Sequence, residues 1–292
     1  MATNSVEAEI GIIGGSGLYD FPGLGNVSEF RLSTPFGNPS DVVTVGDLNG
    51  RRVAFLARHG RHHQHSPSSL PVAANIYALK YLGVREVISV SAVGSLREHL
   101  RPGELVVPDQ LVDFTRGRRS TFFDRGLVAH LPFAEPFCPR LREQVLASVG
   151  SVTDVTSHDS GTYLCIEGPQ FSTRAEAGVN RALGMDVIGM TAAPEAKLAR
   201  EAGLCLATIA LVTDYDCWRE NEEPVTAAMV AEVMRRNVAA VRKAILHFTR
   251  SPRGERTCGC QDALAHAIMS NAASMSDGDR DRLDLLAGPY LS

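Results

Sequence analysis

Short apolar runs recur along the chain and are separated by longer amphipathic stretches. Each run has four to six residues and ends close to a Gly, Ser or Asp, as buried strands do. The runs are Glu9–Ile13, Val53–Ala57, Glu86–Val90, Glu104–Val107, Thr162–Ile166, Asp186–Met190 and Ala207–Val212.

The stretches between the runs have helical length and periodicity. The longest places five apolar residues on one face: Val230, Val233, Met234, Val238 and Val241. Strand and helix signals in alternation are typical of an α/β fold, and we expect a central sheet flanked by helices. The predicted helices are Leu70–Leu82, Pro139–Val149, Thr173–Leu183, Ala193–Ala202 and Thr226–His247.

We predict one large domain, residues 1–250, followed by a short extension, residues 251–292. The chain has 292 residues, of which 44% are hydrophobic, so a sizeable core is expected. Ser251–Arg256 is a linker rich in Pro, Gly and charge, and Ser274–Arg282 is polar. The extension is therefore interpreted as an appendage without assigned elements.

The charge balance excludes several classes of partner. The chain has 29 Lys and Arg against 33 Asp and Glu, a formal net charge of −4, so no general basic field attracts nucleic acid or an anionic membrane. Met1–Glu9 has no signal-peptide pattern, and no stretch approaches the roughly 18 apolar residues of a membrane span. We expect a cytoplasmic protein that binds any phosphate locally.

The six cysteines show no disulfide framework. Cys258-Gly259-Cys260 lies in the extension, and we expect free thiols there in a reducing cytoplasm. The other four stand in apolar surroundings typical of buried free thiols: Cys138, Cys165, Cys205 and Cys217.

A glycine-rich loop, Gly14-Gly15-Ser16-Gly17, directly follows the first apolar run. Its glycines allow backbone N–H groups to converge on an anion, and Ser16 adds a hydroxyl. The loop lacks the Gly-Lys-Ser/Thr of a Walker loop, and Asp20 replaces the third glycine of a dinucleotide fingerprint. A phosphate contact and a plain tight turn both fit it.

Arg58-His59-Gly60-Arg61-His62-His63-Gln64-His65 follows another run. The guanidinium of Arg58 and the imidazole of His59 suit an anion at the carboxyl end of a strand. Four histidines in seven residues can also ligate zinc, but no second group of ligands at a defined spacing accompanies them. We therefore favour the anion and expect no metal.

Three further runs end in polar groups. Ser91 follows Val87–Val90, and Thr191 lies at the start of the predicted helix that contains Pro194-Glu195. Asp214 and Asp216 follow the most hydrophobic run. One carboxyl can be protonated and act as an acid while the other accepts hydrogen bonds, although isolated Asp-x-Asp sequences usually cap turns. Convergence of these ends predicts a ligand crevice.

Several of these motifs together resemble the methylthioadenosine phosphorylase branch of the purine nucleoside phosphorylases. The resemblance covers about Glu9 to His247 and is highly specific. Its motifs are Gly11-Ile12-Ile13-Gly14-Gly15-Ser16-Gly17, Thr34-Pro35-Phe36-Gly37, Ala57-Arg58-His59-Gly60, Glu135-Pro136-Phe137-Cys138, Glu167-Gly168-Pro169 and Thr213-Asp214-Tyr215-Asp216-Cys217-Trp218.

The resemblance implies a single α/β domain with a central mixed sheet, usually in a homotrimer. It implies phosphorolysis of a purine nucleoside into free base and pentose 1-phosphate, with inorganic phosphate as co-substrate and no metal or organic cofactor. Asp214 would protonate the purine N7, Asp216 would bind the exocyclic amine, and the Asp pair favours 6-aminopurines. The phosphate-binding residues it implies are Ser16, Arg58, His59, Ser91, Ala92 and Thr191.

The remaining site residues are also implied by resemblance. Met190 and Phe171 would contact the nucleoside, and His130 of a neighbouring subunit would contribute to the 5′ pocket. Ala227 and Ala231 replace the larger aliphatic residues of animal relatives, which widens that pocket. The residues assigned to substrate specificity are Ser172, Ala227, Val230, Ala231 and His130.

Two alternatives remain open at this point. The first is a phosphorylase for another adenosine, either unmodified or with a 5′-deoxy or 5′-halogenated ribose. The second is a nucleoside hydrolase or a nucleoside-binding protein, which would leave Arg58, Ser16 and Thr191 without a purpose.

Overall fold

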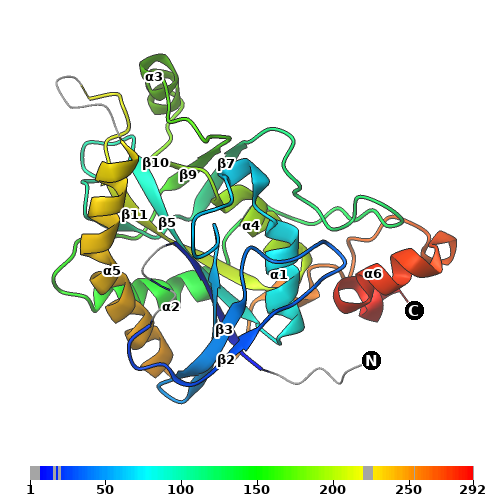
Figure 1. Ribbon diagram of the computed structural model, residues 1–292. Coiled ribbons are helices and arrows are strands. Elements are labelled where there is room, and N and C mark those ends of the chain that lie inside the picture. The colour runs from blue at the N-terminus through cyan, green and yellow to red at the C-terminus, as the bar shows by residue number, and fades with distance from the viewer. Residues whose placement is uncertain (1–6, 16–17, 19–20, 220–225, 253, 292) are drawn as a thin grey trace.

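The computed structural model describes residues 7–15, 18, 21–219, 226–252 and 254–291. Within them, eleven strands form one mixed sheet in the order β2-β3-β4-β1-β5-β10-β9-β7, while β11 pairs with β5 and β6, and β8 pairs with β6 (Figure 1). The strands are β1 (Ile10–Gly14), β2 (Gly25–Phe30), β3 (Val43–Leu48), β4 (Arg51–Ala57), β5 (Glu86–Ser95), β6 (Leu105–Val106), β7 (Gln110–Phe114), β8 (Ser157–His158), β9 (Thr162–Ile166), β10 (Val187–Gly189) and β11 (Cys205–Asp214).

Helices cover both faces of this sheet. α1 (Val72–Tyr81) and α4 (Ala192–Glu201) pack together over one face, and α2 (Pro139–Gly150) and α5 (Ala227–Arg250) over the other. β11 contacts helices of both layers and is buried over nearly its whole length, as its mostly apolar sequence requires. No helix within the described residues is long and apolar enough to cross a membrane. The mixed sheet and its two helical layers confirm the predicted fold class.

Helix α3 (Arg174–Ala182) stands apart from these layers, at the top of Figure 1. Thr173 and Glu176 form a reciprocal capping box that fixes its start. The helix buries little of itself, and Val179 and Leu183 are 57% and 55% exposed. Such an apolar surface is typical of a contact with another chain.

Each predicted run overlaps a strand, but four of the described strands have no counterpart among the runs. β2 is exposed along its length, β3 is interrupted by Gly46, β7 is only half-buried, and β8 has two residues. None therefore produces a continuous apolar run. The predicted helices are confirmed to within a few residues at each end.

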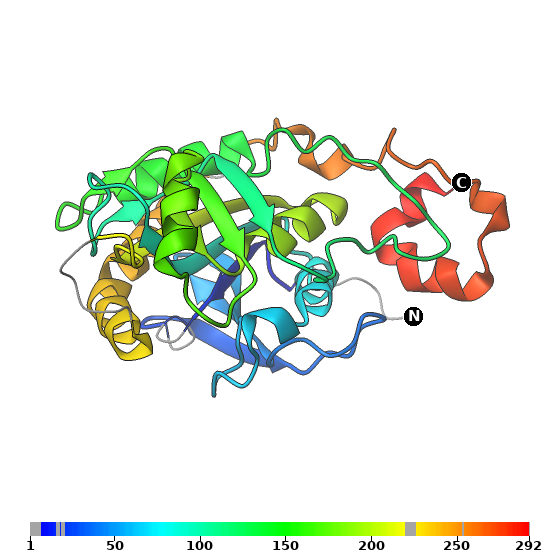
Figure 2. The same cartoon turned by 90° about the horizontal axis from the view of Figure 1, so that it is seen from above.

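The C-terminal extension is more ordered than the sequence indicates. Most of the polar segment Ser274–Arg282 forms the first half of α6 (Asp277–Ala287), which buries Leu283 and Leu286 in the same core cluster as α1 and α4. The extension lies beside the loop between β7 and α2, where Ala129 pairs with Ile268 (Figure 2). The first half of α6 is charged, and its apolar residues are confined to the second half, so the sequence shows no helical apolar periodicity there.

A buried ion pair connects three elements of the fold. The side chains of Arg58, after β4, and Glu195, in α4, are 3% and 2% exposed, and Arg58 Nε donates to Glu195 Oε1 at 2.5 Å. Arg58 also donates to the Ser89 hydroxyl at 2.7 Å and to the Val90 carbonyl at 2.8 Å, both in β5. The pair therefore holds the ends of β4, β5 and α4 in register.

Glu195→Gln should lower the free energy of unfolding by about 3–5 kcal/mol, because the amide keeps the shape of Glu195 but leaves the Arg58 charge buried without its counterion. Denaturant unfolding of wild type and variant measures this. Asp154→Asn is the matched control, since it breaks the exposed ion pair between Asp154 and Lys243 and should barely move the midpoint. Equal losses in both variants would contradict a special role for the buried pair.

Candidate functional site

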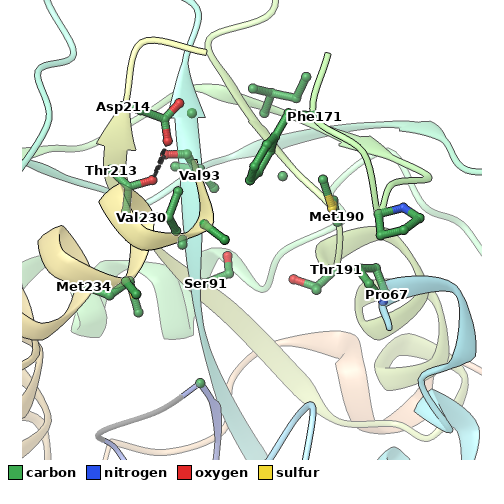
Figure 3. A pocket seen from close by; sticks show the side chains of 18 of the residues that line it. Pro67, Ser91, Val93, Phe171, Met190, Thr191, Thr213, Asp214, Val230 and Met234 are labelled. Carbon is green, nitrogen blue, oxygen red and sulfur yellow. Dashed lines mark hydrogen bonds between the residues drawn. The ribbon is translucent and has the colours of Figure 1, made fainter. Parts of the chain in front are cut away.

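A cavity of about 600 Å³ lies among β5, β10, the end of β11 and the first turns of α5 (Figure 3). Its volume suits a ligand of nucleoside size. It is lined by Gly15, Arg58, His59, His63, Pro67, Val90, Ser91, Ala92, Val93, Gly94, Ile166, Pro169, Phe171, Ser172, Ile188, Gly189, Met190, Thr191, Thr213, Asp214, Asp216, Ala227, Val230, Ala231, Met234 and Arg235.

Two hydroxyl groups lie at one end of this cavity. In Figure 3, Ser91 and Thr191 face each other across its floor. β5 and β10 run antiparallel, with Ile188 opposite Gly94, so the continuation of that register brings Thr191 opposite Ser91. The Thr191 hydroxyl is buried and makes no hydrogen bond within the described residues. An unpaired buried hydroxyl is costly unless a ligand satisfies it.

This geometry corrects one part of the sequence argument. Ser91 was expected just after a strand, but β5 continues through Ser95 because its second half pairs with β10 and β11. Ser91 therefore points into the cavity from within a strand. Thr191 does precede a helix, since α4 begins at Ala192, although its side chain does not cap that helix.

His59 adds a neutral imidazole to the same end. Burial lowers the pKa of His59 to about 4, so the ring is uncharged at neutral pH. Its Nδ1 lies 2.8 Å from the His65 carbonyl oxygen, which can only accept, so Nδ1 carries the proton. The other ring nitrogen is then an acceptor.

Arg58 also lines the cavity, with its guanidinium held by Glu195 and β5 as described above. Gly15, the residue directly after β1, also lines the cavity. Ser16, the predicted phosphate ligand of the glycine-rich loop, lies outside the described residues. Ala92 lines the cavity between Ser91 and Val93.

Two carboxylates lie at the opposite end. Asp214 ends β11 and accepts hydrogen bonds from the Thr213 hydroxyl and the Asp216 backbone N–H, both at 2.7 Å (Figure 3). The backbone turns at Asp216, with a φ of 53°. Burial raises the pKa of Asp216 to about 6, and the nearby charge of Asp214 acts in the same direction.

The walls between the two ends are apolar. Met190 and Phe171 face each other across the space in Figure 3, and Phe171 remains 43% exposed. Ser172 lines the cavity beside Asp216 and accepts a hydrogen bond from the Cys217 thiol through its backbone carbonyl. Cys217 was expected in the core, but it is half-buried at this site.

Helix α5 closes the remaining side. Ala227, Val230 and Ala231 all line the cavity, as their spacing along one helix face predicts. Met234, one turn further on, also lines the cavity (Figure 3). The sequence placed it on the apolar face of this helix but did not identify it as a site residue.

One predicted site residue does not reach the cavity of its own chain. His130 lies in the loop that pairs with the extension, where its backbone N–H donates to the Ala267 carbonyl at 2.8 Å. It does not belong to the cavity lining. A role for His130 at this site therefore requires a second chain.

Two positioning residues escaped the sequence argument. Glu195 was interpreted only as part of a helical turn, yet it holds Arg58. Arg118, whose side chain is 5% exposed, donates to the backbone carbonyls of Met190 and Glu167 and so holds two cavity loops together. Neither residue belongs to a local motif, because each acts across a long stretch of chain.

Comparisons with known proteins agree on one family. Residues 9–250 match the Phosphorylase superfamily. The chain is 49% identical to an S-methyl-5′-thioadenosine phosphorylase of Koribacter versatilis, over 98% of this chain and 97% of that one. It is 50% identical to one of Chloroflexus aurantiacus, over 98% and 99%.

Solved structures give the same result. A methylthioadenosine phosphorylase from an antarctic soil metagenomic library superposes with a TM-score of 0.89 at 45% identity, covering 97% of this chain and 99% of that one. The methylthioadenosine phosphorylase of Schistosoma mansoni in complex with adenine superposes with a TM-score of 0.83 at 37% identity, covering 92% and 99%. By its sequence, its fold and the layout of its cavity, the chain belongs to the phosphorylase superfamily.

Proposed function

We propose that the protein cleaves 5′-methylthioadenosine by phosphorolysis, releasing adenine and 5-methylthioribose 1-phosphate. The observation that carries this proposal is the division of one cavity into an end with hydroxyl and imidazole groups and an end with two carboxylates. The names of the relatives support the same substrate. Such an activity serves purine and methionine salvage.

At the first end, Ser91, Thr191, His59 and Arg58 would bind inorganic phosphate, together with Ser16 and the backbone at Ala92. The unpaired Thr191 hydroxyl is available as a donor. The neutral His59 ring offers an acceptor, which suits an oxygen of phosphate that still carries its proton. A phosphate held there can attack C1′ of the ribose, and we propose no metal or organic cofactor for this step.

At the second end, Asp214 would take up a proton from solvent as the nucleoside binds and give it to N7 of the leaving adenine, and Asp216 would accept from the exocyclic amine. Protonation makes the base a better leaving group as positive charge develops on the ribose. Met190 and Phe171 would pack against the nucleoside between the two ends. Ser172, beside Asp216, would contribute to substrate specificity, and the first turns of α5 would surround the 5′ substituent.

We also propose a homotrimer that operates in the cytoplasm. The outward apolar side chains of Val179 and Leu183 support contact between subunits. The loop that carries His130 projects with the extension, and Val128 and Met269 are exposed there. This projection could be reached by a neighbour, which would bring His130 to the 5′ pocket of another subunit.

Cleavage of 5′-methylthioadenosine should depend strictly on phosphate, because the proposed nucleophile is phosphate itself. The measurement is adenine release in buffer freed of phosphate, followed by titration with inorganic phosphate, and methylthioribose 1-phosphate should appear in equal amount. Undiminished cleavage without phosphate would identify a hydrolase. Binding without cleavage in either buffer would identify a nucleoside-binding protein.

Asp214→Asn should lower kcat on adenine nucleosides by about 10²–10⁴-fold, since an amide cannot give a proton to N7. The matched variant is Asp216→Asn, which preserves that acid. In wild type, kcat/KM should fall as the pH drops below about 6, where Asp216 becomes protonated and can no longer accept from the amine as a carboxylate.

Asp216→Asn should therefore lose this acid limb while keeping most of its kcat. Full activity of Asp214→Asn on adenine nucleosides would eliminate Asp214 as the acid. An unchanged acid limb in Asp216→Asn would assign that titration to another group.

The small side chains of Ala227 and Ala231 should admit 5′-alkylthio groups longer than methyl, with about 0.8 kcal/mol gained for each methylene that becomes buried. Ala231→Leu should penalise propylthioadenosine more than methylthioadenosine, because leucine fills the space that only the longer group occupies. Comparison of kcat/KM for both substrates and for adenosine tests this and ranks the alternative substrates. A uniform change across the three would remove α5 from the 5′ site.

A further inference from the structure

Four cysteine thiols gather where the C-terminal extension meets the body of the protein. Cys138 precedes α2, Cys205 begins β11, and Cys258 and Cys260 belong to the short 3₁₀ turn Gly259–Asp262 and its N-cap. All four Sγ atoms lie within 4.8 Å of one another. Three of these cysteines are buried, Cys258 is half-buried, and all are free.

The spacing of these sulfur atoms fits a single tetrahedral metal ion. A zinc ion bound at about 2.3 Å by four thiolates separates neighbouring sulfur atoms by about 3.8 Å. Cys205 Sγ and Cys258 Sγ lie 3.3 Å apart, a few tenths of an ångström closer than that. The backbone N–H of Cys138 donates to the Leu206 carbonyl at 2.8 Å, which keeps Cys138 beside Cys205. A small outward adjustment of side chains would open the centre.

The surrounding charges suit a thiolate centre. Four thiolates around a divalent cation carry a net charge of −2. Arg256 Nε donates to Cys205 Sγ at 3.3 Å, and Arg140 Nη2 lies 3.7 Å from the same sulfur. Arg140 also pairs with Glu86, so the positive charge is shared. Donors to sulfur lower the cost of keeping thiolates in a partly buried place.

We propose that Cys138, Cys205, Cys258 and Cys260 bind one structural zinc ion. Binding would release the four thiol protons to solvent and form four Zn–S bonds, with no change of oxidation state. Soft thiolate ligands in a closed set of four favour zinc over the hard cations and leave no open position for catalysis. The site lies apart from the nucleoside cavity, none of whose lining residues it includes.

Such an ion would fasten the extension to the body. Two of its ligands come from the extension, one from the start of α2 and one from the start of β11. Near it, Arg256 Nη2 donates to the Gly203 carbonyl at 2.5 Å. The same extension supports the loop that carries His130, through the pairing of Ala129 with Ile268. Zinc would thus stabilise a part of the chain that lies outside the family match at residues 9–250.

The test is elemental analysis of the full chain, produced in zinc-containing medium and purified under mild reduction. We expect about one zinc per chain in wild type. We expect near-complete loss of zinc in Cys258→Ser/Cys260→Ser, with a lower thermal midpoint. Replacement of zinc by cobalt should produce the intense visible absorption of tetrahedral cobalt thiolates in wild type and not in the double variant.

Cys165→Ala is the matched control, because Cys165 is buried but lies outside the cluster. It should keep its zinc. Zinc that persists in the Cys258→Ser/Cys260→Ser variant would place the metal elsewhere, for example at the histidine tract, and would overturn the proposal. Metal-free wild type would overturn it as well, whether peptide mapping finds the four cysteines as thiols or joined in disulfides.

Discussion

The buried pair of Arg58 and Glu195 is the interaction on which the cavity depends. An isolated guanidinium at this depth would be prohibitively costly, so Arg58 requires both its counterion and the oxygens of β5. These contacts also restrict where the ends of β4, β5 and α4 can lie. The guanidinium that lines the cavity thus also aligns the strand ends around it, so the site and the fold depend on the same contacts.

The position of the Asp214 carboxylate and of the nearby loops depends on how closely β5, β11 and the loops after β9 and β10 approach one another. A Cβ atom at Gly94 would lie 2.9 Å from a carboxylate oxygen of Asp214, so a larger residue there would displace that carboxylate from its position at the cavity. The pairing of these strands shifts register between Val212 and Asp214, which turns the carboxylate toward the cavity. Arg118 then holds the loops after β9 and β10 by their carbonyl groups.

The C-terminal extension is attached to the body of the protein by few buried contacts. Its helix buries few residues, and its contacts reach the loop between β7 and α2 rather than the nucleoside cavity. A segment with so little core of its own gains from a cross-link to the body. The convergence of Cys258 and Cys260 on Cys138 and Cys205 occurs at the base of this segment, where one bound ion would restrain it most.

The sequence alone determined most of the elements and the types of group at the site, but not β2, β3, β7, β8 or α6. Continuous apolar runs predicted the buried strands because burial on both faces leaves no alternation to obscure them. Local motifs identified Arg58, His59, Thr191 and the Asp pair because each lies within a few residues of a strand. The sequence also indicated the family, since those motifs occur together along most of the chain.

Only the tertiary structure decided which distant residues meet. Glu195 reaches Arg58 across 137 positions, and Cys258 reaches Cys205 across 53. The antiparallel approach of β10 to β5, which places Thr191 opposite Ser91, is a property of strand pairing and leaves no local signature. Contacts of this kind depend on packing between elements, and packing joins residues without regard to their separation along the chain.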